Sequence, residues 1–140
     1  MKKIFFFLCI LFYSVGCFSQ SKDWIFIGKS KDTLSYFIKT EITNKGEYDR
    51  RSNVISVWTK RLKYRNPKDE SQGIEIIRRS LMHFDLDKQQ YQVGTTVETN
   101  SIGEITSSYK YDESDGAWQD IVPETIADYT LQKAQALSKK

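Results

Sequence analysis

The sequence predicts an α+β fold: an antiparallel sheet of five to six strands with a single C-terminal helix packed on one face. Segments rich in β-branched and aromatic residues follow one another with only short turn signals between them, as in an antiparallel meander. The one segment with helical periodicity comes last, after residue 124. It has a single apolar stripe, so we expect it to lie on the sheet.

The first 19 residues are expected to be a removable export signal. Lys2 and Lys3 precede an apolar run over residues 4–15, which is too short to span a bilayer, for which about 20 residues are needed. Small residues at Cys17 and Ser19 predict cleavage after Ser19. The alternative is a buried N-terminal element of a domain that stays inside the cell, but that does not explain why these three features occur in this order.

Lipidation at Cys17 is a second possibility for the same segment. The run from Ser14 to Cys17 (SVGC) resembles a bacterial lipoprotein box, although Ser14 stands where Leu is usual. A lipidated chain would be anchored to a membrane surface, whereas a chain cleaved after Ser19 would be soluble.

Residues 20–140 are expected to form one domain. The whole chain carries a net charge of +3; without Lys2 and Lys3, 19 basic and 18 acidic residues leave +1. A nearly neutral domain argues against nucleic-acid binding. Both cysteines, Cys9 and Cys17, lie in the export segment, so the core alone must hold the domain together.

The elements are expected in the following order. Asn44-Lys45-Gly46 signals a turn, residues 65–73 a polar loop, and residues 112–123 a loop before the helix. Strands are predicted at residues 24–27, at 33–40 (extending as far as 42), and at 53–64, 74–86, 91–99 and 104–111.

The strand at residues 74–86 and the C-terminal helix each have one face that can be assigned to the core. Alternation places Met82, Phe84 and Leu86 on one face of their strand and His83 and Asp85 on the other. Thr125 is the expected helix N-cap, with Asp128 at the capping-box position, and the apolar stripe contains Ile126, Ala134 and Leu137.

The sequence offers little for catalysis, so we expect no enzyme and no cofactor. His83 is the only histidine, and no nucleophile elbow, phosphate loop or metal-spaced cluster is found. His83, Asp85 and Asp87 point the same way on a strand and could converge on a cation. The alternative, which we favour, is the polar face of a strand running into a turn.

Two groups of residues are candidates for partner binding. Lys60, Arg61, Lys63 and Arg65 form a basic cluster that could bind a polyanion, a lipid headgroup or an acidic protein surface; alternatively they form a solvated hairpin end. Trp118, in the loop before the helix, either plugs the end of the sheet or stands exposed as a contact residue.

Trp24 and Trp58 are expected in the core, because both lie within apolar strands.

Five motifs, in order, resemble those of the surface-adhesin protein E family, small exported bacterial domains. They are WIFI at 24–27, YFI at 36–38, VISVW at 54–58, SLMHFDL at 80–86 and WQDIVP at 118–123, and together they span about residues 23–137. The resemblance implies an antiparallel sheet with a helix on its concave face. It also implies a place in the cell envelope, and in some members binding of host matrix proteins.

One departure from the family pattern concerns a disulfide. The resemblance implies a cysteine after the Phe-Asp pair and another in the last helix, but Leu86 stands at the first position and the helix has none. We expect Leu86 to pack against Leu137 or its neighbours instead.

The sequence thus predicts an exported, non-enzymatic binding or structural module, with adhesin-like protein binding as its most specific form. The alternatives are a periplasmic accessory lipoprotein anchored through Cys17, and a binder of small ligands on the concave sheet face.

Overall fold

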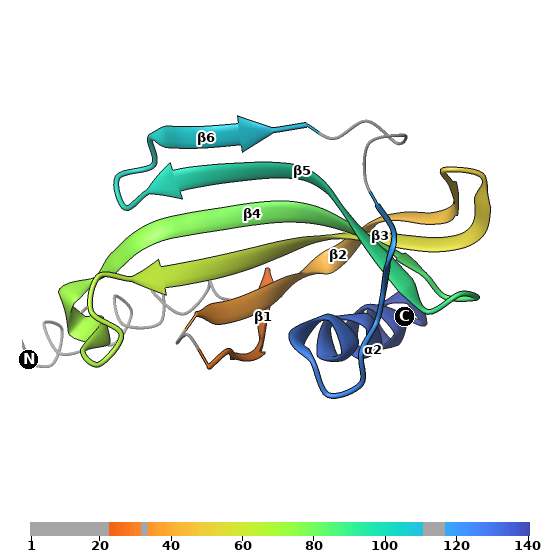
Figure 1. Ribbon diagram of the computed structural model, residues 1–140, viewed down its shortest axis with the longest axis horizontal. Coiled ribbons are helices and arrows are strands. Elements are labelled where there is room, and N and C mark those ends of the chain that lie inside the picture. Colours follow the sequence, from red (N-terminus) through yellow and green to blue (C-terminus); the bar gives the residue numbers. More distant parts are fainter. Residues whose placement is uncertain (1–22, 32–33, 111–116) are drawn as a thin grey trace, which may run out of the picture.

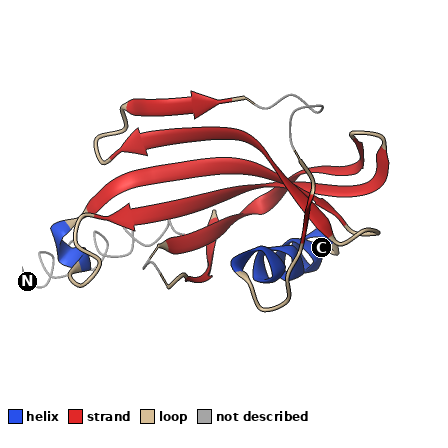
Figure 2. Ribbon diagram, viewed as in Figure 1, coloured by secondary structure: helices blue, strands red, loops and turns tan. Residues whose placement is uncertain are grey.

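The computed structural model describes residues 23–31, 34–110 and 117–140. The predicted export segment, including Cys17 and the cleavage after Ser19, lies outside them. Within these residues, seven strands form one antiparallel sheet in the order β1-β2-β3-β4-β5-β6, and β7 pairs with β5. One α-helix, α2, ends the chain (Figures 1 and 2), so the predicted α+β fold class is confirmed.

The elements have the following bounds. The strands are β1 (Trp24–Lys29), β2 (Ser35–Tyr48), β3 (Arg51–Tyr64), β4 (Ile74–Asp85), β5 (Gln90–Asn100), β6 (Ile105–Tyr109) and β7 (Gln119–Asp120); the 3-10 helix η2 is Glu70–Gln72 and α2 is Ile126–Ser138.

The turn predicted at residues 44–46 is wrong, because β2 continues through it. The chain reverses instead at Asp49 and Arg50, whose φ angles of 47° and 60° suit a two-residue hairpin turn. The glycine is accommodated inside the strand, where Gly46 has a φ of 140° and a register shift follows it.

The core lies between α2 and one face of the sheet. Ile55, Val57 and Phe84 pack with Leu131 and Ala134 of the helix, and each is at most 2% exposed. Leu86, Met82 and Leu137 are partly buried against this cluster, in agreement with the orientation expected of Leu86. We call this the helix-side face of the sheet and the other the opposite face.

Thr125 begins the helix as predicted, because its hydroxyl accepts a hydrogen bond from the backbone N–H of Asp128. Figure 1 shows α2 at one end of the sheet, while the other end, where η2 joins β3 to β4, extends away from it. The lengths explain this: 13 helical residues span about 20 Å, whereas the 14 residues of β3 span about 45 Å. Part of the helix-side face is therefore left open.

Over the part of the chain that is described, no helix is both long enough and apolar enough to cross a membrane.

Candidate functional site

Asp85 lies at the end of β4 and is almost fully buried, with 3% of its side chain exposed. Arg51 donates to its Oδ2 at 2.6 Å, and the backbone N–H groups of Asp87 and Lys88 donate to Oδ1 at 3.0 Å. Burial raises the pKa of Asp85, but the hydrogen bonds from Lys88, Arg51 and Asp87 and the charge of Arg51 outweigh it, so the pKa is lowered.

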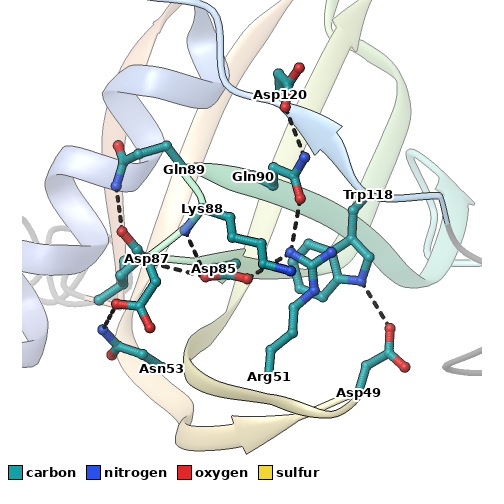
Figure 3. Close-up of polar contacts among 11 residues, drawn as sticks. Asp49, Arg51, Asn53, Asp85, Asp87, Lys88, Gln89, Gln90, Trp118 and Asp120 are labelled. Carbon is teal, nitrogen blue, oxygen red and sulfur yellow. Dashed lines mark hydrogen bonds and ion pairs between the residues drawn. The ribbon is translucent and has the colours of Figure 1, made fainter.

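Arg51 extends this network to the segment before the helix (Figure 3). Its guanidinium also donates to Gln90 at 2.9 Å and stacks over the ring of Trp118, 3.9 Å from the ring centroid. The indole N–H of Trp118 donates to Asp49 at 2.9 Å. Trp118 is thus half-buried and fastened to the β2–β3 hairpin, which supports the sheet-plug interpretation over a free contact residue.

His83 is buried on the opposite face, with 4% exposed. Its Nδ1 lies 2.7 Å from the hydroxyl of Ser56, and its ring stacks on Tyr48 with centroids 3.8 Å apart. Burial lowers its pKa to about 4, although the charge of Asp49 acts to raise it. His83 is therefore neutral at pH 7.

The three residues considered for a cation do not converge. His83 bonds to Ser56, Asp85 to Arg51, and Asp87 accepts a hydrogen bond from Asn53 at 2.9 Å. In residues 23–31, 34–110 and 117–140, no group of three His, Cys, Asp or Glu side chains could hold a metal ion. Ser56 is only 2% exposed, so its hydroxyl is not open to a substrate.

The basic cluster does not form one surface. Alternation along β3 turns Lys60 to the opposite face and Arg61 to the helix-side face. Lys63 forms an ion pair with Glu75 at 2.9 Å, and Arg65 is exposed beyond the end of β3. Neighbours in sequence are therefore separated by the sheet itself.

The expectation that Trp24 and Trp58 lie in the core is wrong. Both are only half-buried. Alternation places them on the opposite face with Lys60, and α2 covers only the other face. Apolar neighbours made both resemble core residues, but no described helix packs over them.

A groove of about 610 Å³ occupies the helix-side face beyond α2. Its lining comes from strands β2 to β6, from Ala117 and Gln119 in the segment before the helix, and from the first turns of α2. Its lining combines aromatic, apolar and charged side chains, among them Tyr36, Arg61, Arg78, Met82, Glu98 and Ile126.

Sequence reasoning missed this groove, although one signal was available. Thr59, Arg61, Arg78, Ser80 and Glu98 share the face that carries the core farther along the strands. Polar residues at these positions indicate that the face is not covered over its whole length. His83, Asp85 and Trp118 are not among the residues that line the groove.

Comparison with protein-family models, with curated proteins and with solved structures gave no match for this chain. The resemblance to the surface-adhesin protein E family therefore stays a prediction from sequence motifs.

Proposed function

We propose that the chain is an exported, non-enzymatic binding module of the bacterial cell envelope, and that its groove receives an acidic segment of a partner protein. Adhesin-like binding is the most specific form of this function. The observation that carries the proposal is Arg61, a groove residue for which the described part of the chain supplies no ion-pair partner.

The electrostatics of the groove favour an anionic ligand. Arg61 lies directly opposite Arg78 in the β3–β4 register, and Arg78 forms an ion pair with Glu98. Of these two facing cations, only Arg78 therefore has a carboxylate partner among the described residues. Because like charges on facing strands are unfavourable, a ligand carboxylate beside Arg61 would gain a charge-assisted hydrogen bond and relieve repulsion.

The size of the groove supports a second candidate, a small anionic molecule. About 610 Å³ lies within the usual range for small-ligand pockets, roughly 300–1,000 Å³. Met82 and Val93 supply apolar contact and Tyr36 an aromatic wall. The helix covers only part of this face, so it does not exclude such a ligand.

The non-enzymatic part of the proposal rests on the buried polar groups. Ser56 and His83 form the only described Ser–His contact, and both are closed off from solvent. Asp85 is engaged by Arg51 and two backbone N–H groups. These residues stabilise the fold instead of offering a nucleophile.

The export part is tested by the intact mass of the protein recovered from its native cell envelope. A mass that begins at Gln20 supports a soluble exported module. An acyl adduct on Cys17 supports the accessory-lipoprotein alternative. A chain that keeps Met1 in cells competent for export contradicts both.

The binding site is tested with a phage-displayed random peptide library selected on that protein. We expect the selected peptides to be rich in Asp and Glu. Arg61→Glu should weaken their binding at least tenfold, since hydrogen bonds to charged groups contribute roughly 1.5–3 kcal/mol. Lys63→Glu, the same charge reversal outside the groove lining, is the control and should have a much smaller effect. Equal losses in both variants would contradict the proposed site.

A small-ligand role is tested separately with a library of carboxylate-bearing small molecules. Binding that Arg61→Glu abolishes, with no peptide selected, would favour the second candidate over the first.

A further inference from the structure

The opposite face of the sheet carries an aromatic–basic patch, which we define as Trp24, Phe26, Phe37, Trp58, Lys60 and Arg79. Strand register brings them together: Phe26 pairs with Phe37, Phe37 with Lys60, and Lys60 with Arg79. Trp58 lies two residues before Lys60 and therefore on the same face. These residues come from β1, β2, β3 and β4.

Lys60 and Arg79 are a like-charge pair directly across β3 and β4, an arrangement that destabilises a sheet. The helix-side face has the matching pair Arg61 and Arg78, but there β5 supplies Glu98. On the opposite face β5 places Val97 beside Arg79. Within the described residues, no carboxylate pairs with Lys60 or Arg79.

Lys60 lies in an environment that disfavours its positive charge. Its pKa is lowered, first by burial and then by the charge of Arg79. Its ammonium lies over two rings, 4.6 Å from the centroid of Trp24 and 4.9 Å from that of Phe37. The rings compensate part of the charge, but they do not neutralise it.

Of the four aromatic side chains in the patch, Phe26 is exposed and the other three are partly exposed. Phe26 is 57% exposed and packs edge-on against Phe37 at 5.4 Å, while Trp24 and Trp58 are half-buried. Exposed apolar residues that form a contiguous patch on a sheet face mark an interaction surface.

We propose that the aromatic–basic patch docks on the anionic surface of a phospholipid bilayer, with Lys60 and Arg79 on lipid phosphates. Tryptophan rings favour the headgroup level of a bilayer, and basic residues are attracted to anionic lipids. The phosphates would supply the counter-charge that β5 supplies on the other face. Phe37 and Lys60 also contribute to the groove lining, but alternation turns their side chains to the opposite face, away from Arg61 and Arg78.

If Cys17 is lipidated, chain length favours a bilayer over an acidic protein as the occupant. Trp24 begins the outermost strand, and six residues separate it from Cys17. Six extended residues reach at most about 20 Å. If Cys17 is lipidated, the patch cannot move farther than this from the membrane, and its cations and rings are then held within reach of the headgroups.

The test is partition of the protein, as the cell processes it, onto vesicles of phosphatidylcholine with and without phosphatidylglycerol. We expect binding to require phosphatidylglycerol and to weaken with salt. The double variant Lys60→Gln with Arg79→Gln should lose about thirtyfold in partition, from roughly 1 kcal/mol for each basic residue near an anionic surface. The matched control, Lys63→Gln with Arg65→Gln, removes the same charge from outside both the patch and the groove lining and should lose well under tenfold.

If an acyl anchor on Cys17 holds every variant on the vesicles, partition cannot distinguish the variants, and a second measurement is needed. Quenching of tryptophan fluorescence by brominated phosphatidylglycerol reports whether the patch itself enters the headgroup region. We expect quenching in the wild type and the control, and its loss in the Lys60/Arg79 variant. Removing that pair relieves repulsion, so the variant should fold, which its thermal unfolding checks. Equal partition onto both vesicle types, or equal losses in both double variants, would overturn the proposal.

Discussion

Arg51 and Asp85 form an ion pair at 2.6 Å in which only 17% and 3% of the two side chains are exposed. The pair ties the β2–β3 hairpin to the turn after β4. Gln90 and the ring of Trp118 occupy the remaining sides of the guanidinium. The end of the sheet is thus closed by a polar network and not by apolar packing alone.

Removing the cation of this pair should be strongly destabilising. Arg51→Ala leaves the carboxylate of Asp85 buried with only backbone donors, so we expect a loss of about 3–5 kcal/mol in the free energy of unfolding. Lys63→Ala, which breaks the exposed pair with Glu75, should cost under about 1 kcal/mol. Urea denaturation compares the two, and similar losses would mean that burial does not set the strength of the first pair.

His83 should make the protein acid-sensitive. The unfolded chain binds a proton on this residue near pH 6.5, whereas the folded chain binds it only near pH 4. The unfolded state therefore holds more protons between these values, and stability falls as pH drops through that window, by about 3 kcal/mol in all. Denaturation of the wild type and His83→Gln from pH 7.5 to 4 measures the difference. Parallel pH profiles would contradict this assignment.

Asp85 should act in a lower pH window. Because its folded pKa is lowered, its contribution to stability is present above the unfolded value of about 3.9 and is lost as pH falls through the folded pKa. Asp85→Asn should therefore be less stable than wild type at neutral pH, with a gap that narrows below pH 4. A gap that stays constant down to pH 2 would exclude this linkage.

A side chain at position 94 is expected to destabilise the fold, because the space beside Gly94 is already filled. A Cβ there would lie 2.7 Å from Nε2 of His83 and 3.1 Å from the carbonyl oxygen of Leu81. Since His83 is held by its neighbours, Gly94→Ala should cost about 1–3 kcal/mol. The control is Gly28→Ala, whose Cβ would meet only Ile126 at an ordinary 3.5 Å. We expect no loss there, and thermal unfolding of both variants would show whether steric contact decides the outcome.

Leu86 and Leu137 should be energetically coupled if they pack together as the sequence suggested. Both are partly buried against the same cluster. A double-mutant cycle with Leu86→Ala and Leu137→Ala measures the pairwise term by urea denaturation, and we expect at least about 0.5 kcal/mol. Strict additivity would mean that each leucine packs on the cluster independently.

The sequence predicted the order and type of β1 to β6 and of α2, because strand and helix periodicities differ clearly. It missed β7, which lies within the loop expected at residues 112–123. It misplaced the β2–β3 turn, because several polar residues between Asn44 and Arg50 could each reverse the chain. The stacking of Tyr48 on His83, a contact between strands, selects the turn at Asp49 and Arg50 over the other candidates.

The candidate sites were harder to predict, because they depend on what the helix fails to cover. Lys60 and Arg61 are neighbours in sequence, yet their side chains lie on opposite faces of the sheet. Trp58 lies in an apolar strand next to the core residue Val57, but its side chain points to the face on which α2 does not pack.

Because α2 covers only one end of the long strands, the backbone amides at the two ends should differ in their protection from hydrogen exchange with solvent. In β3, Val57 lies in the core under α2, whereas Lys63 lies near the far end, which α2 does not cover. Amide hydrogens within one strand should therefore exchange at graded rates, slow near Val57 and faster towards Lys63. The far end could open transiently while the end beneath the helix stays folded. The two ends of one sheet would then unfold locally with different free energies.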